Sequence, residues 1–251
     1  MSAEPVPVPA GSAAGDLAFA PRALQAVPDE ARQLRADLLY GRLLATAAAN
    51  AAGGGPPHQG RLRRADGHVE PLPLARWLGP VDDADADLLE CVEGSALDIG
   101  CGPGRHVAAL QAAGHPGLGI DLSPVAVEIT RGRGADAILG SVFEHVPDAG
   151  SWGTALLLDG NIGIGGEPAQ LLGRARELLA PGGAVLAELD PPGAWSGVTR
   201  VRLEAPGVVS EWFPWARVGV DTVKDVAAQA GLARDWTMCS GGRWFTALRR
   251  S

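Results

Sequence analysis

The segment LDIGCGPGRH, residues 97–106, places a glycine at every second position directly after a short apolar run. A strand, a glycine-rich turn and a helix in this order form a nucleotide site, because no side chain covers the turn and the first amides of the helix are unpaired. Gly100, Gly102 and Gly104 are spaced as GxGxG. A dinucleotide-binding turn, GxGxxG, would need its third glycine at position 105, which is Arg105, so the spacing disfavours a dinucleotide.

An acidic residue follows the next apolar run. Asp121, in GLGIDLSP, lies 21 residues beyond Gly100. In a doubly wound sheet an acid about 20 residues after the glycine turn accepts hydrogen bonds from ribose hydroxyls. Capping of the following helix is the alternative role, but Ser123 already stands at the cap position. The glycine turn and Asp121 together predict an adenosine-type ligand.

Candidate catalytic residues stand where later strands should end. Asp159 and Asn161 follow the predicted fourth strand, in LLLDGNIGIGG. Ligands of open α/β sheets bind at this carboxyl edge, although an Asx-turn would also explain the two residues. His145 follows the predicted third strand and is a candidate base near neutral pH, with a solvated loop residue as the alternative.

Two further segments could line a substrate pocket. ELDPPGAW follows the predicted fifth strand, and its Glu188, Asp190 and Trp195 are expected to border the pocket. EWFPWARVG, residues 211–219, concentrates aromatic side chains near the same edge. These aromatics could form an apolar wall for a substrate or pack in the core.

These residues require an α/β scaffold to position them. From Ser95 onward, short apolar runs alternate with helical stretches, which predicts a Rossmann-like, doubly wound and mostly parallel sheet with crossover helices. RDWTMC and RWFTALR are joined through Ser-Gly-Gly without a helix, so these two strands must form an antiparallel hairpin.

The chain divides into three predicted regions. Residues 1–28 are rich in proline, alanine and glycine and are expected to form a disordered tail. Residues 29–94 are predicted to be a helical cap with a small hairpin that turns at Asp66-Gly67. Residues 95–251 form the predicted ligand-binding domain.

The composition of the chain disfavours several classes of binding partner. The net charge is −8 with a single lysine, which disfavours binding to nucleic acid. No apolar run is long enough for a membrane span, so we expect a cytoplasmic protein without a membrane partner. The three cysteines are widely spaced and predict neither a disulfide framework nor a metal site.

The sequence resembles the class I S-adenosylmethionine-dependent methyltransferases. The resemblance covers roughly residues 90–251 and rests on LDIGCGPG, GIDLSP and LLAPGGAVLAELD. It implies a seven-stranded sheet that ends in an antiparallel hairpin. It also implies S-adenosylmethionine as the cofactor, whose sulfonium and ammonium groups suit a pocket rimmed by Asp98, Asp121 and Asp159.

The resemblance also implies roles for individual residues. The three loop glycines would approach the methionine half of the cofactor, Asp98 would support the loop and the ammonium group, and Asp121 would bind the ribose. Leu122 would cover one face of the adenine. The family usually has an acid after the third strand, where this chain has Ser141, so Val142 and Phe143 are alternative adenine contacts. Because Pro103 follows, Gly102 is expected to be extended.

The function that these features predict is methyl transfer from S-adenosylmethionine to a small-molecule acceptor. Holding donor and acceptor in line can supply most of the acceleration, so a base is optional. Two alternatives differ in class: a non-catalytic cofactor-binding or interaction protein, motivated by Ser141, and a nicotinamide-dependent oxidoreductase, motivated by the glycine turn.

Overall fold

The computed structural model describes residues 32–53 and 59–250. The predicted tail, residues 1–28, lies outside these ranges. No helix within them combines the length and the apolar character that a membrane crossing requires.

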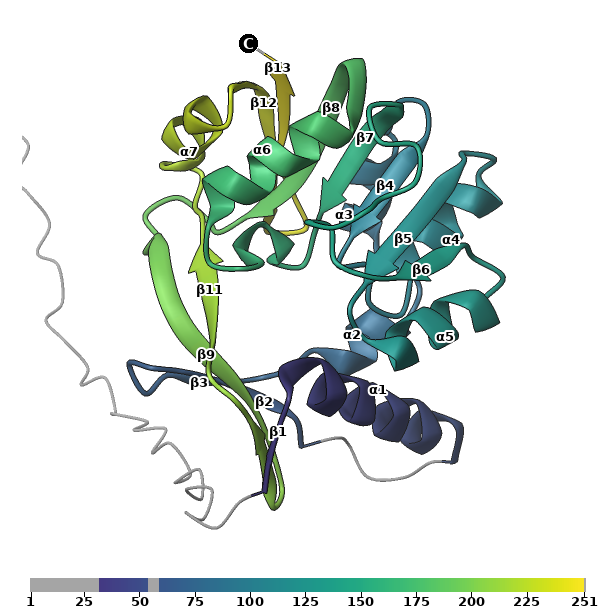
Figure 1. Ribbon diagram of the computed structural model, residues 1–251, viewed down its shortest axis with the longest axis vertical. Coiled ribbons are helices and arrows are strands. Elements are labelled where there is room, and N and C mark those ends of the chain that lie inside the picture. The colour runs from purple at the N-terminus through teal and green to yellow at the C-terminus, as the bar shows by residue number, and fades with distance from the viewer. Residues whose placement is uncertain (1–31, 54–58, 251) are drawn as a thin grey trace, which may run out of the picture.

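A seven-stranded sheet forms the centre of the fold (Figure 1). Its strand order is β12-β13-β8-β7-β4-β5-β6, in which β4 to β8 run parallel and β13 is antiparallel to both of its neighbours. This arrangement confirms the predicted Rossmann-like α/β fold. The strands are β4 (Ala96–Ile99), β5 (Gly117–Asp121), β6 (Ala137–Leu139), β7 (Trp152–Leu157), β8 (Leu179–Leu189), β12 (Leu232–Ser240) and β13 (Arg243–Arg250).

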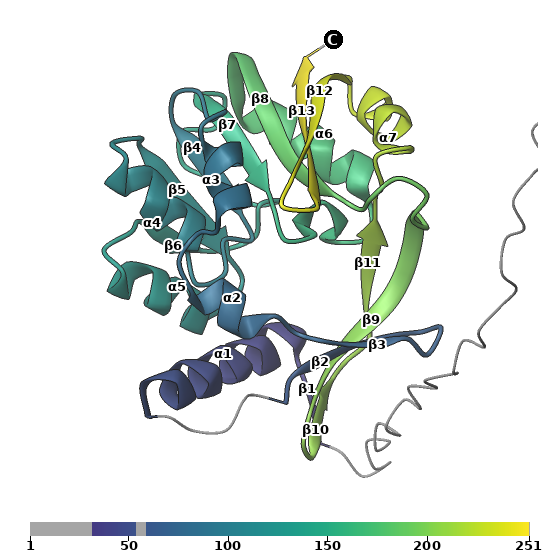
Figure 2. The same cartoon turned by 180° about the vertical axis from the view of Figure 1, so that it is seen from behind.

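Helices cover both faces of this sheet because its strands are apolar on both sides. Leu157 and Val185 pack with α6 (Pro168–Leu178) and α7 (Val223–Gln229) on one face. Leu156 and Leu186 point the other way, toward α3 and α4. Figure 2 shows this second face from behind. Its helices are α3 (Asp83–Leu89), α4 (Arg105–Ala112) and α5 (Pro124–Gly132).

A second sheet lies beyond the carboxyl edge of the first. Its order is β1-β10-β9-β2-β3, with β11 paired to β9. The predicted Asp66-Gly67 hairpin is present, but its strand β2 also pairs with β9, so residues 61–64 and 201–204 share a sheet. The predicted helical cap is therefore only partly helical. The strands are β1 (Arg32–Leu34), β2 (Arg61–Arg64), β3 (Val69–Pro71), β9 (Gly197–Ala205), β10 (Val208–Ser210) and β11 (Phe213–Arg217).

Two N-terminal helices join the sheets. The longer helix, α1 (Ala36–Gly53), packs on α5 so closely that a Cβ on Gly41 would lie 2.9 Å from Ser123 Oγ. The short α2 (Leu74–Leu78) packs beside α1 through an apolar cluster that includes Leu39, Leu44 and Leu74. Figure 1 shows α1 and α2 beside the second sheet.

Candidate functional site

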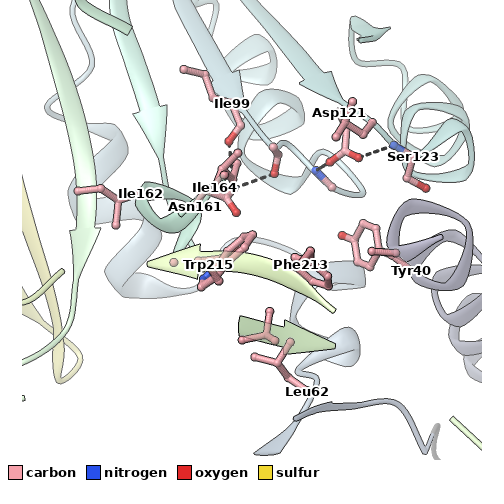
Figure 3. A pocket seen from close by; sticks show the side chains of 18 of the residues that line it. Tyr40, Leu62, Ile99, Asp121, Ser123, Asn161, Ile162, Ile164, Phe213 and Trp215 are labelled. Carbon is pink, nitrogen blue, oxygen red and sulfur yellow. Dashed lines mark hydrogen bonds between the residues drawn. The ribbon is translucent and has the colours of Figure 1, made fainter. Parts of the chain in front are cut away.

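A cavity of about 880 Å³ lies between the two sheets. One wall consists of the carboxyl ends of β4, β5 and β7 with the loops that follow them. The opposite wall consists of side chains from β2, β9 and β11, and Figure 3 shows Phe213 and Trp215 there, across from Ile99 and Asn161. The cavity is thus at the edge where ligands of open α/β sheets bind.

The glycine loop is left-handed at all three glycines. The φ angles are +72° at Gly100, +53° at Gly102 and +75° at Gly104. The expectation of an extended Gly102 is therefore wrong. The preference imposed by Pro103 is overridden because the Gly102 N–H donates to Asp121 Oδ2 at 2.9 Å and its carbonyl accepts from Thr130 Oγ1 at 2.9 Å.

Protein atoms also require these glycines. An added Cβ at Gly100 would lie 2.7 Å from Asn161 Nδ2, and one at Gly102 would lie 2.8 Å from Tyr40 Oη. A Cβ at Gly104 would lie 2.3 Å from Thr130 Cγ2. Gly104 is absent from the cavity wall, so within the described residues it serves the contact between α4 and α5, whereas Gly100 and Gly102 face the cavity.

Asp121 sits at the cavity wall with its carboxylate held by backbone. Its Oδ1 accepts from Ser123 N–H at 2.8 Å, and its Oδ2 accepts from the Gly102 amide. Burial raises the pKa of this carboxyl, partly offset by those hydrogen bonds. Ser123 Oγ caps α5, as predicted, by accepting from Ala126 N–H at 3.4 Å. Leu122, 56% exposed, lines the cavity next to Asp121.

The segment after β6 forms the adjoining wall. Ser141, Val142 and Phe143 all line the cavity. The Ser141 hydroxyl oxygen accepts from Phe143 N–H at 3.2 Å, which leaves its proton free to be donated. His145, by contrast, is exposed and is not among the residues that line the cavity. The structure therefore does not bring the candidate base to the site.

Asp98 is a buried carboxylate at the cavity wall. It is 1% exposed, and neither of its oxygens has a hydrogen-bond partner among the described residues. His106 Nδ1 lies 3.6 Å from Asp98 Oδ2, and His106 Nε2 lies 3.4 Å from Asp85 Oδ1. Burial alone would lower the pKa of His106, but the two acids beside its ring raise it to about 9. The neighbouring acids thus favour the protonated form of His106, which makes it a poor candidate for a base.

Asp159 lies in the cavity wall, but arginines surround its carboxylate. Arg105 Nη2 donates to both of its oxygens, at 3.0 and 3.1 Å, and Arg76 Nη2 lies 3.2 Å from Oδ1. The Asp159 N–H donates to Glu188 Oε2 at 2.7 Å, and Glu188 in turn accepts two hydrogen bonds from Arg243. Asp159 has a φ of +55°, which is uncommon for a residue with a side chain.

Asn161 connects the end of β7 to the glycine loop. Its Nδ2 donates to the carbonyls of Ile99, at 3.0 Å, and Gly100, at 2.8 Å (Figure 3). These bonds fix the loop against η1 (Asn161–Gly163). The side-chain amide is therefore occupied in positioning the loop.

The second sheet supplies a largely apolar wall. Phe213 and Trp215 contact each other edge to face with ring centroids 6.2 Å apart, and Leu62 lies on the same wall. Charged side chains also line the cavity on this side, among them Arg64, Glu211 and Arg217. Asp190, which follows β8, pairs with Arg217 and lines the cavity as predicted. Trp195 does not line the cavity: it is 54% exposed and lies 5.8 Å from the Arg64 guanidinium.

Sequence analysis missed the contributions of α1 and α2. Tyr40 and Trp77 line the cavity, with ring centroids 5.9 Å apart. The helical spacing around Tyr40 was visible in the sequence, but it does not tell which face meets a cavity, and no pattern singled out Trp77. In the described ranges no cluster of three or more histidines, cysteines or acids could hold a metal ion.

Comparison with known proteins agrees with this geometry. Residues 96–183 match a family described as "Methyltransferase domain". An uncharacterized 37.1 kDa protein of a Streptomyces fradiae transposon is 35% identical over 122 residues, which are 42% of this chain and 32% of that protein. The chain thus matches about a third of the length of that curated relative.

Solved structures share the fold. A methyltransferase from Bacteroides fragilis, crystallised with S-adenosylhomocysteine, has a TM-score of 0.70 and 22% identity, covering 88% of this chain and 99% of its own. An amino pentose methyltransferase from Micromonospora echinaspora has a TM-score of 0.52 and 19% identity, covering 70% and 94%. Residues 96–183 thus match a methyltransferase family, and the chain shares the fold of solved S-adenosylmethionine-dependent methyltransferases.

Proposed function

We propose that the protein transfers a methyl group from S-adenosylmethionine to a small-molecule acceptor. The observation that carries this proposal is Asp98, a buried carboxylate without a hydrogen-bond partner among the described residues, beside a glycine loop and a cavity. His106 Nδ1 lies 3.6 Å from Asp98, and the ammonium group of the cofactor would add the hydrogen bonds that the Asp98 oxygens lack. The residues present therefore fit this cofactor.

The remaining cofactor contacts follow from the cavity wall. Asp121 keeps acceptor capacity beyond its two backbone hydrogen bonds, which suits ribose hydroxyls. Leu122 and Val142 would contact the adenine, and the Ser141 hydroxyl can meet its polar edge. Gly100 and Gly102 line the cavity, and because they carry no side chain their backbone is open to a ligand.

The acceptor would occupy the space next to the second sheet. Phe213, Trp215 and Leu62 favour a molecule with an apolar or aromatic part. The bound cofactor supplies an electrophilic methyl group. Asp159 and Asn161 would act by position: Asn161 fixes the glycine loop, and Arg105 holds both carboxylate oxygens of Asp159.

Calorimetry with S-adenosylhomocysteine and with NADH tests the proposal. We expect S-adenosylhomocysteine to bind and NADH not to bind. Asp98→Asn keeps the shape but removes the charge, and it should weaken S-adenosylhomocysteine binding by about 1.5–3 kcal/mol, the value of a hydrogen bond to a charged group. Formation of S-adenosylhomocysteine from S-adenosylmethionine, screened over small-molecule acceptors, then tests the transfer itself. Binding of NADH alone would overturn the proposal.

A further inference from the structure

The wall of the cavity carries an excess of acidic side chains. Among the described residues that line it, eight are aspartates or glutamates, four are arginines and one is a histidine. Arg76 and Arg243 stand outside this wall and contact Asp159. Both also contact Asp82 and Asp85, which stand outside the wall too, so the excess of negative charge remains. A cavity lined mainly by one sign of charge attracts ligands of the opposite sign.

The arginines on the side of the second sheet are already paired. Each of the three that line the cavity there contacts an acid, so none of them is left to attract an anionic ligand. A bound S-adenosylmethionine would offset only part of the excess, because its sulfonium and ammonium groups are opposed by its own carboxylate. The pairs are Arg35–Asp37, Arg64–Asp66 and Arg217–Asp190.

Two acids on this wall, Glu70 and Glu211, form no ion pair with an arginine or lysine of the described ranges. Glu70 is half-exposed, with His68 Nε2 3.8 Å away. Its charge also acts on Arg217, whose pKa is raised by Asp190 first and by Glu70 in addition. Glu211 is therefore the acid of this wall that is least offset by cations.

Glu211 has one oxygen in use and one that is open. Its Oε1 accepts from the Ala36 N–H at 2.9 Å, which caps the start of α1. Its Oε2 makes no hydrogen bond to another described residue. The open oxygen belongs to a half-buried side chain that lines the cavity, so a ligand can reach it.

Aromatic rings stand beside Glu211 on the same wall. Phe213 and Trp215 follow it at every second position, and both face the cavity (Figure 3). Side chains alternate along an extended chain, so the three residues share one face. A carboxylate beside aromatic rings suits an ammonium group, which donates to the first and is attracted by the negative faces of the second.

We propose that the acceptor carries a cationic aliphatic amine and that Glu211, with Phe213 beside it, binds this ammonium group. The inference rests on the proposed function and names the class of acceptor for the same cavity. Glu211 then has two tasks: its Oε1 holds the start of α1, and its Oε2 selects the ligand. Both residues lie outside the segment, 96–183, that matches the methyltransferase family, so the second sheet sets the specificity.

Three probes of similar size and different charge test the inference. At neutral pH 2-phenylethylamine is a cation, 2-phenylethanol is neutral and phenylacetate is an anion. Calorimetry with the protein saturated with S-adenosylhomocysteine should show that the amine binds about tenfold more tightly than the alcohol, the effect of a hydrogen bond between charged groups, and that phenylacetate binds least. Glu211→Gln keeps an oxygen for the Ala36 N–H and removes the charge. It should abolish the preference for the amine and leave the affinity for the alcohol unchanged.

Glu177→Gln is the matched control. Glu177 pairs with Arg174 in α6 and does not line the cavity, so this variant should keep the wild-type preference. A wild type that binds the amine no more tightly than the alcohol would overturn the inference, and so would a Glu211→Gln variant that retains the preference. Equal weakening of all three probes by Glu211→Gln would assign Glu211 to the cap of α1 alone and would also overturn it.

Failure of the proposed function has a different signature. If the wild type does not bind S-adenosylhomocysteine, the cofactor assignment falls and the inference falls with it. If it binds S-adenosylhomocysteine but does not prefer the amine, the cofactor assignment stands and only the amine site is refuted. Thermal melting without ligand checks that each variant folds. If Glu211→Gln does not fold, Phe213→Leu carries the test: loss of the ring should reduce the preference for the amine several-fold, and an unchanged preference would refute the site.

Discussion

Substitution of Gly102 by alanine should destabilise the protein even without a ligand. The φ of +53° puts this residue in the left-handed region, where a side chain costs about 1–2 kcal/mol. The new Cβ would also lie 2.8 Å from Tyr40 Oη, so the tyrosine must shift or the loop must move. For a chain of this size, about 1–2 kcal/mol lowers the melting temperature by roughly 2–8 °C, and the contact with Tyr40 adds to that loss.

A double-mutant cycle separates the two contributions. In a Tyr40→Phe background the oxygen is gone, so Gly102→Ala should cost only the backbone part. Urea unfolding of the four proteins gives the difference. Gly173→Ala, in α6, is the control: no atom lies within 4 Å of its Cβ position, and alanine there should stabilise by up to about 1 kcal/mol. An equal cost in both backgrounds would refute the Tyr40 contact, and no cost in either would refute the left-handed loop.

Three further substitutions probe the surroundings of the loop. Gly104→Ala should destabilise more than Gly102→Ala, because its Cβ would lie 2.3 Å from Thr130 Cγ2; an equal melting temperature for the two variants would contradict that packing. The raised pKa of His106, about 9, contributes about 3 kcal/mol of stability below pH 6.5 that is lost as pH rises to about 9, since the folded state holds the proton longer than the unfolded state. We therefore expect the free energy of unfolding, measured with urea at several pH values, to fall as the pH rises from 6.5 to about 9, and to fall less in His106→Gln. An unchanged pH dependence in that variant would contradict this role of His106. Arg243→Met leaves Glu188 and Asp85 without this cation and should cost about 3–5 kcal/mol in the same assay, whereas a cost below 1 kcal/mol would mean that the cluster is solvated.

Local sequence patterns correctly predicted the turns, the helix cap and the order of elements, because each of these depends on residues that are neighbours in the sequence. The Asp66-Gly67 turn, the Ser123 cap and the alternation of strands and helices after Ser95 each depend on neighbouring residues, and the structure has all three. The glycine loop and Asp121 were also placed together correctly, because consecutive parallel strands end at the same edge of a sheet.

The second sheet depends on contacts that no local pattern reports. Strand β2 pairs with β9 across more than a hundred intervening residues, with Leu62 opposite Leu203. The alternation of apolar residues along VTRVRLEA indicates a strand but not its partner. The cavity wall on this side, and its closure by Tyr40 and Trp77, therefore could not be predicted.

The environment of Asp159 could not be predicted either, because its contacts come from residues far away in the sequence. The sequence placed it at a strand end, where a free carboxylate could act as a base or attract a cation. Its partners come from α2, α4 and β13 and form an ion cluster around it. Arg76 and Arg105 contact its carboxylate, and Arg243 lies 3.8 Å from the carboxylate and also binds Glu188, which accepts from the Asp159 amide.

The cluster gives a physical reason for the strained backbone of Asp159. A φ of +55° costs free energy at a residue with a side chain, and it persists only where surrounding contacts fix both the amide and the carboxylate. Glu188 holds the amide and Arg105 holds the carboxylate. The turn so fixed presents Asn161 to the glycine loop, whose carbonyls it binds. The charge of Asp159 thus serves to fix the loop, and the contribution to the proposed methyl transfer that this geometry supports is the alignment of donor and acceptor.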